Sequence, residues 1–120
     1  MGSEYCVYVA IPERVNVPIV INVTDSSVEL SYDAPAYSHH SEVIKYMLQY
    51  RVVGDAEWQS MPETLSLRQV VTGLEENTVY SFVVSARYAG GPWGSPSPRL
   101  SVKTKATEPS KSYLCVRTKC

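Results

Sequence analysis

The sequence predicts an all-β fold, an antiparallel β-sandwich of about seven strands. Apolar and polar side chains alternate along several short segments, and this period of two is typical of strands that bury one face. Turn-forming residues separate these segments at short intervals, as in an antiparallel sandwich. Nine tyrosines, eight prolines and many valines also favour β structure.

The first predicted strand of the sandwich covers residues 14–24 and lies at an edge, because Pro18 cannot donate to a backbone ladder. Asp25-Ser26 makes the turn that follows. Residues 27–32 form the next strand, and residues 33–41 form a loop. The inward side chains of that second strand are Val28, Leu30 and Tyr32.

A long strand is predicted at residues 43–53, and alternation assigns its two faces. The inward side chains are Ile44, Tyr46, Leu48, Tyr50 and Val52. The outward side chains are Lys45, Met47, Gln49 and Arg51. A turn at Gly54-Asp55 leads to a short strand at residues 58–61, which Pro62 ends.

A further strand covers residues 67–71. If Leu67 and Val71 point inward, Gln69 does so too and needs a hydrogen-bond partner. The strand at residues 78–88 has the clearest alternation in the chain, with one buried face and one solvent face. Its inward side chains are Tyr80, Phe82, Val84, Ala86 and Tyr88, and its outward side chains are Ser81, Val83, Ser85 and Arg87.

The chain divides into one domain with extensions at both ends, as its length of 120 residues allows. Residues 1–11 are an N-terminal extension or the end of a preceding domain, residues 12–104 form the domain, and residues 105–120 are a linker and C-terminal tail. Within the domain, residues 90–98 form a turn-rich loop and residues 99–104 form the last short strand.

The domain resembles the fibronectin type III family, whose fold is an immunoglobulin-like β-sandwich. The residues that carry the resemblance are Val28-x-Leu-x-Tyr-x-Ala-Pro35, Ile44-x-Tyr-x-Leu-x-Tyr-Arg51, Trp58, Gly73-Leu74, Thr78-x-Tyr80, Ala86, Gly90–Pro98 and Val102-x-Thr104. The resemblance implies that Tyr80, after Leu74, is a tyrosine corner whose hydroxyl bonds to upstream backbone. Tyr32 stands where the family usually has tryptophan, so its hydroxyl needs a partner.

Catalysis, cofactors and metals are not expected. The sequence contains no nucleophile elbow, phosphate-binding glycine loop or His-Glu-x-x-His motif. His39 and His40, near Glu42, are the one cluster that resembles a metal site, but adjacent side chains of an extended segment point to opposite sides. A formal net charge of −1 with scattered charges argues against nucleic-acid binding, and no apolar run is long enough to insert into a membrane.

The compartment depends on Asn22 and three cysteines. Asn22 begins an N-glycosylation sequon, which would place the domain outside the cell, and such triplets also arise by chance. Cys6 could pair with Cys115 or Cys120 in an oxidising compartment, or all three could be free thiols in the tails. We expect an extracellular or cell-surface ectodomain, with the cytoplasm as the alternative.

Trp93 is a candidate binding residue, although a structural role is favoured for it. It could be an exposed anchor in a loop at one end of the sandwich, or it could stack on an outward arginine, of which Arg87 is the nearest. Tyr37, His39 and His40 lie in a loop expected at the same end, so the two loops could form a shared protein-binding surface.

The expected function is protein–protein recognition or spacing, without catalysis, in a larger adhesion or receptor protein. The partner is another protein, and tandem domains are one option for the parent chain. Trp93-Gly-Ser-Pro-Ser resembles part of the Trp-Ser-x-Trp-Ser box of cytokine-receptor domains, which gives a ligand-binding domain of that type as one alternative. An intracellular scaffold module is the other.

Overall fold

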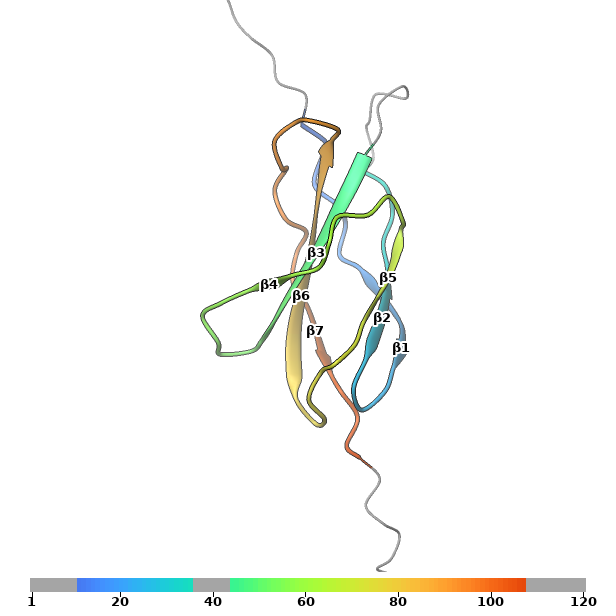
Figure 1. Cartoon of the computed structure of the whole chain (residues 1–120), viewed down its shortest axis with the longest axis vertical. Helices are drawn as coiled ribbons and strands as arrows, with labels where there is room; N and C mark the ends of the chain where they lie inside the picture. The colour runs from blue at the N-terminus through green and yellow to red at the C-terminus, as the bar shows by residue number, and fades with distance from the viewer. Residues whose placement is uncertain (1–10, 36–43, 108–120) are drawn as a thin grey trace, which may run out of the picture.

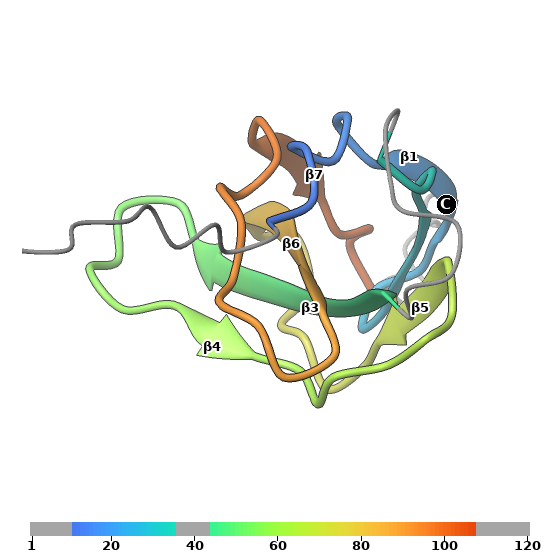
Figure 2. The same ribbon diagram turned by 90° about the horizontal axis from the view of Figure 1, so that it is seen from above.

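The computed structural model describes residues 11–35 and 44–107 and folds them into two packed antiparallel sheets (Figures 1 and 2). The seven strands of this part of the chain are β1 (Ile19–Val23), β2 (Val28–Ser31), β3 (Ile44–Val52), β4 (Gln59–Ser60), β5 (Arg68–Val71), β6 (Val79–Tyr88) and β7 (Leu100–Lys103). One sheet has the order β1-β2-β5 and the other has the order β4-β3-β6-β7. The predicted all-β sandwich is therefore confirmed.

The three-stranded sheet has β1 at one edge, as Pro18 predicted. The strand begins directly after this proline, at Ile19, and not at residue 14. A register shift between Val20 and Asn22 interrupts the β1–β2 ladder. Although it precedes the strand, Val15 is 1% exposed and belongs to the core.

The four-stranded sheet is built on the pairing of β3 with β6, which runs from Ile44 opposite Tyr88 to Val52 opposite Tyr80. Leu48 and Val84 face each other near the centre of this ladder, and both are fully buried. Because the paired residues share a face, the alternation of one strand reinforces that of the other. The inward assignments made from the sequence for both strands hold.

The core lies between the two sheets, and the largest fully buried side chains include Leu30, Leu48 and Phe82. Each of these contributes about 1.5–3 kcal/mol by leaving water. Tyr50 lies against Phe82, with ring centroids 6.2 Å apart in a stacked arrangement. The core is thus made by side chains that alternate along β2, β3 and β6.

The prediction that one face of β6 is exposed to solvent is wrong. Ser81, Val83 and Ser85 are 4–6% exposed. The connection between β6 and β7 runs beside β6, where Gly94 N–H donates to the Ala86 carbonyl and Ser97 N–H donates to the Val84 carbonyl, each at 2.8 Å. Side chains from neighbouring strands add to this cover, so both faces of β6 are buried.

Gly94 is required by this close approach of backbone segments. A Cβ atom at this position would lie 3.0 Å from the Pro12 carbonyl oxygen and 3.3 Å from the Ala86 carbonyl oxygen. The described chain therefore enters the sandwich beside the β6–β7 connection, at one end of the molecule (Figure 1).

The described chain leaves at the opposite end, where backbone and side-chain bonds hold the segment after β7 (Figure 1). The Thr104 hydroxyl accepts a hydrogen bond from Thr78 N–H at 3.0 Å and donates to the Glu75 carbonyl at 2.6 Å. Lys105 N–H donates to the Thr24 carbonyl at 3.0 Å. This exit strap, residues 104–107, joins the β1–β2 turn to the β5–β6 turn.

Candidate functional site

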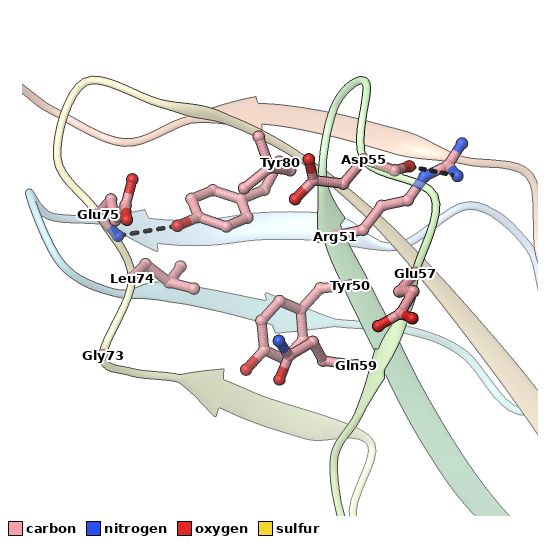
Figure 3. A pocket seen from close by; sticks show the side chains of 10 residues that line it. Tyr50, Arg51, Asp55, Glu57, Gln59, Gly73, Leu74, Glu75 and Tyr80 are labelled. Carbon is pink, nitrogen blue, oxygen red and sulfur yellow. Dashed lines mark hydrogen bonds between the residues drawn. The ribbon is translucent and has the colours of Figure 1, made fainter.

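The β5–β6 turn carries the tyrosine corner that the resemblance implies. Tyr80, near the start of β6, accepts a 2.8 Å hydrogen bond at its hydroxyl from the Glu75 N–H (Figure 3). Leu74 N–H donates to the Ser26 carbonyl at 2.9 Å, and the Leu74 side chain is buried. Gly73 supplies the positive φ of 73° that the turn needs. These residues fix the turn, and they also form one side of a pocket.

Tyr32 lies at the other predicted special position, in the core beyond β2. Its hydroxyl donates to the Ser66 carbonyl at 2.7 Å and accepts from the Gln69 amide Nε2 at 3.0 Å. Burial raises the pKa of the Tyr32 hydroxyl, and the Gln69 hydrogen bond acts in the opposite direction. Tyr32 and Gln69 were each expected to need a hydrogen-bond partner, and each is the partner of the other. Leu67, by contrast, is 43% exposed and does not point inward.

A pocket of about 330 Å³ opens between the β3–β4 turn and the β5–β6 turn (Figure 3). Tyr50 and Leu74 line it together with the carboxylates of Asp55, Glu57 and Glu75. The Arg51 side chain also lines the pocket, and its Nη1 donates to the Asp55 carbonyl at 2.9 Å. No cluster of three potential metal ligands occurs in residues 11–35 and 44–107. The pocket thus offers opposite charges side by side, without a nucleophile–base pair among these lining groups.

Trp93 stacks on Arg87, which is one of the two arrangements expected from the sequence. The Arg87 guanidinium lies 4.9 Å from the centre of the indole. Its Nη2 donates to both carboxylate oxygens of Glu63, at 2.9 and 3.0 Å, and its Nη1 donates to the Gly91 carbonyl at 3.1 Å. The ring is half-buried, so one part of it is fixed by packing while another part still reaches solvent.

Trp58 forms a second stack on the same outer face of the four-stranded sheet. The Arg51 guanidinium lies 4.5 Å from the centre of the Trp58 ring, and the Arg99 guanidinium lies 5.7 Å from it. Arg51 belongs to β3 and Arg99 directly precedes β7, and these strands flank β6. The indole therefore covers the outer side of β6, near Val83.

A groove of about 290 Å³ adjoins this stack. Its walls are formed by Arg14, Gln49, Trp58, Val83 and the segment Pro96–Arg99. The Arg14 Nε donates to the Pro96 carbonyl at 2.8 Å, which fixes the side chain from the N-terminal segment across the β6–β7 connection. We call the two tryptophan stacks and this groove the Arg–Trp face.

Of the predicted binding residues, Trp93 alone belongs to the described part of the chain. The other predicted binding residues and the predicted disulfide residues lie outside it. Tyr37, His39 and His40 fall in residues 36–43, and Cys6, Cys115 and Cys120 fall in the two ends of the chain. The shared loop surface and the cysteine pairings therefore remain predictions. Asn22 is described, and its exposed position on the edge strand β1 meets the geometric condition for a glycan.

Sequence reasoning did not identify Trp58, Arg99 or Arg14 as parts of a common surface. One signal was present, because a hairpin centred on the predicted Gly54-Asp55 turn places residue 51 opposite residue 58. The observed pairing of Tyr50 with Gln59 has this register. Arg14 and Arg99 are far apart in the chain, and only the folded structure brings them to one groove.

Comparison with known proteins gives one family. A model of the fibronectin type III domain matches residues 10–103. Protein sax-3 of Caenorhabditis elegans is 28% identical over 110 residues, which is 90% of this chain and 9% of that protein. Human pikachurin is 29% identical over 114 residues, which is 93% of this chain and 11% of that protein. The chain thus spans about a tenth of the length of these curated relatives.

Solved structures agree with the fold. A crystallised multi-domain segment of titin is 25% identical with a TM-score of 0.71, and the match covers 81% of this chain and 33% of the titin segment. A domain of human fibronectin type III domain containing protein 3 has a TM-score of 0.74 at 20% identity, over 93% of this chain and 100% of that domain. The described residues contain no helix that is long and apolar enough to cross a membrane.

Proposed function

Because the chain belongs to the fibronectin type III domain family, we propose that it is a recognition or spacer module, without catalytic activity, of a larger adhesion or receptor protein. The observation that carries the recognition role is the Arg–Trp face, which gathers two tryptophans and four arginines on one side of the molecule. Tryptophan and arginine are the residue types most enriched where protein interfaces concentrate their binding energy.

The stacks also support recognition by holding these side chains in place before a partner arrives. An arginine fixed against an indole loses less side-chain entropy on binding, and immobilising a free long side chain costs about 0.5–1.5 kcal/mol. Arg87 is held by three groups, namely Trp93, Glu63 and the Gly91 carbonyl. Such a surface is rigid, and a rigid surface favours one partner over many.

A ligand-binding domain of the cytokine-receptor type is the second candidate, and the Arg87–Trp93 stack is the observation that favours it. Trp93-Gly-Ser-Pro-Ser lacks the second tryptophan of the box that it resembles. In this protein the second indole of the Arg–Trp face is Trp58, which directly precedes β4. We therefore rank this candidate below a general adhesion or receptor module.

We further propose that the module works outside the cell, and the exposed sequon at Asn22 supports this placement. An intracellular scaffold is the alternative. The mass of intact protein secreted from eukaryotic cells, measured with and without reductant, separates the two. A glycan on Asn22 supports the extracellular proposal, and a glycan-free protein with three free thiols contradicts it.

The recognition role is tested by binding of labelled, tetramerised domain to a panel of cell types. Trp93→Ala and Trp58→Ala should each lower binding by about tenfold or more if the Arg–Trp face makes the contact. Arg68→Ala is the matched control, because Arg68 lies on the three-stranded sheet. Tyr37→Ala tests the predicted contribution of the other loop.

Unchanged binding by both tryptophan variants, with the fold intact by far-ultraviolet circular dichroism, would contradict recognition through this face. Absence of binding to every cell type, by the original chain as well as by its variants, would leave the spacer role as the proposal. Loss of binding only in Tyr37→Ala would move the contact to the loop that precedes β3.

A further inference from the structure

The outer face of the four-stranded sheet has a marked excess of positive charge, although the whole chain has a formal net charge of −1. The basic side chains on or beside this face are Arg14, Lys45, Arg51, Arg87, Arg99 and Lys103. Among the described residues, only Arg87 of this set has a carboxylate partner, namely Glu63. Arg51 also lies near Asp55 and Glu57 in the pocket described above, whereas the groove that Arg14 and Arg99 line contains no carboxylate.

Hydrogen bonding within the groove leaves mainly donors exposed to a ligand. The Pro96 carbonyl already accepts from Arg14, and the Pro98 carbonyl accepts from the Ser97 hydroxyl at 3.1 Å. The Ser97 hydroxyl in turn accepts from Val84 N–H at 3.0 Å. The terminal guanidinium nitrogens of Arg14 and Arg99 have no hydrogen-bond acceptor among the described residues, so the ligand that fits is one that brings acceptors.

Apart from the two arginines, the groove is lined by the polar residues Gln49 and Ser97 and by four apolar residues. The apolar residues of the lining are Val83, Trp58, Pro96 and Pro98. A volume of about 290 Å³ is at the small end for a ligand site, so a short segment of a partner enters it. A lining that combines apolar side chains with two arginines suits a peptide with a hydrophobic side chain flanked by carboxylates. It suits a sulfated polysaccharide less well, because that ligand has no apolar side chains.

We propose that this groove binds an acidic segment of a partner protein, with carboxylates paired to Arg14 and Arg99 and an apolar side chain over Val83. The inference rests on the proposed recognition function and names the chemistry of its partner. Arginine pairs with carboxylate through two parallel hydrogen bonds, and the Arg99 guanidinium lies 5.7 Å from the centre of the Trp58 ring, within range of a cation–π contact. Lysine cannot make either interaction in the same way.

The test is selection of short random peptides, displayed on phage, against the full chain. The selected peptides should contain two or more Asp or Glu residues around an apolar residue. Their affinity should fall by about tenfold in Arg99→Glu and by a similar factor in Arg14→Ala. Arg68→Glu, on the opposite sheet, should bind the same peptides as the original chain.

Two further measurements make the assignment specific. Arg99→Lys keeps the positive charge but loses the planar guanidinium, which makes two parallel hydrogen bonds and stacks on an aromatic ring. Its loss of affinity should therefore be most of that seen in Arg99→Glu. Replacing Glu by Gln in the best peptide should abolish binding. Raising the salt concentration should weaken the binding of the acidic peptide, because exposed charge pairs are screened.

Several results would overturn the inference. Selection of neutral or basic peptides, acidic peptides that bind Arg99→Glu and Arg14→Ala unchanged, or failure to select any peptide would each do so. Heparin oligosaccharides that bind more tightly than every selected peptide would assign the basic face to a polysaccharide. If the selected peptides are not acidic but still need Trp58 and Trp93, the acidic partner fails while the recognition function stands.

Discussion

The Gln69 side-chain amide donates a 3.0 Å hydrogen bond to the hydroxyl of Tyr32, and this bond joins β5 to the end of β2 inside the sandwich. The same hydroxyl donates to the Ser66 carbonyl. Tyr32 stands at a position where the family usually has tryptophan. The tyrosine ring fills this position in the core, and its polar end is hydrogen-bonded to both Ser66 and Gln69.

Tyr32→Phe should lower the free energy of unfolding by about 1–3 kcal/mol, because it leaves the Ser66 carbonyl and the Gln69 amide without their partner. The change is measured by urea unfolding. The double variant Tyr32→Phe/Gln69→Leu should recover part of the loss, since an apolar pair needs no hydrogen bond. An unaltered stability in Tyr32→Phe would show that water replaces the hydroxyl without cost.

Tyr80→Phe should lower the free energy of unfolding by about 1 kcal/mol, because Glu75 N–H loses the oxygen that accepts its hydrogen bond. Tyr50→Phe is the matched control, since the Tyr50 hydroxyl has no hydrogen-bond partner among the described residues and its ring is kept. Guanidinium unfolding curves of the two variants give the comparison. Equal effects in both would rule out a specific role for the corner bond.

Arg51 and Trp58 should be energetically coupled. A double-mutant cycle with Arg51→Met and Trp58→Leu should give a coupling free energy of about 0.5–1 kcal/mol, as expected for an exposed cation–π contact. The same cycle with Arg68→Met in place of Arg51→Met should be additive, because Arg68 lies on the other sheet. Additivity in the first cycle would mean that the stack contributes packing alone.

The stability of the domain should decrease at alkaline pH because of Tyr32 and Tyr46. Burial raises the pKa of both hydroxyls above the ordinary value of 10.0, so the folded state binds these protons more tightly than the unfolded state. Their contribution is complete below pH 10 and is lost as the pH rises through the folded pKa values. Unfolding measured at about pH 8 and about pH 11 should show the loss, and Tyr32→Phe should make it smaller.

If Tyr32→Phe has the same loss between these two pH values as the original chain, Tyr32 is not a source of the pH dependence. Tyr46→Phe then distinguishes the second tyrosine from more general effects of charge. Because deprotonated tyrosine absorbs in the near ultraviolet, the difference in absorbance between the original chain and each variant at rising pH reports the deprotonation of the replaced tyrosine.

The sequence was sufficient for the core because its signal is local. Alternation in residues 27–32, 43–53 and 78–88 assigns the inward side chains correctly, since a strand places every second side chain on the same face. The arginine beside Trp93 could also be predicted, because Arg87 and Trp93 lie close together in the chain. In both cases the interacting residues are neighbours in sequence or in strand register.

The outer face of β6 could not be predicted in this way. Ser81 and Ser85 are small and polar, and such residues in a strand are usually taken as exposed. They are buried because the β6–β7 connection and long side chains from other strands lie over them. The groove between Arg14 and Arg99 has the same origin, since it depends on where the N-terminal segment crosses the sheet.

The exit strap has a mechanical consequence. The described chain enters beside Gly94 and leaves beside Thr24, so a pulling force applied at residues 11 and 107 acts along the length of the sandwich. The ladder bonds that join β1 to β2 and β7 to β6 lie across this direction. A force in this direction loads these bonds in shear, and the Lys105–Thr24 bond joins the segment after the last strand to the first turn. A domain held in this way would resist extension, which is a property that the proposed spacer role requires.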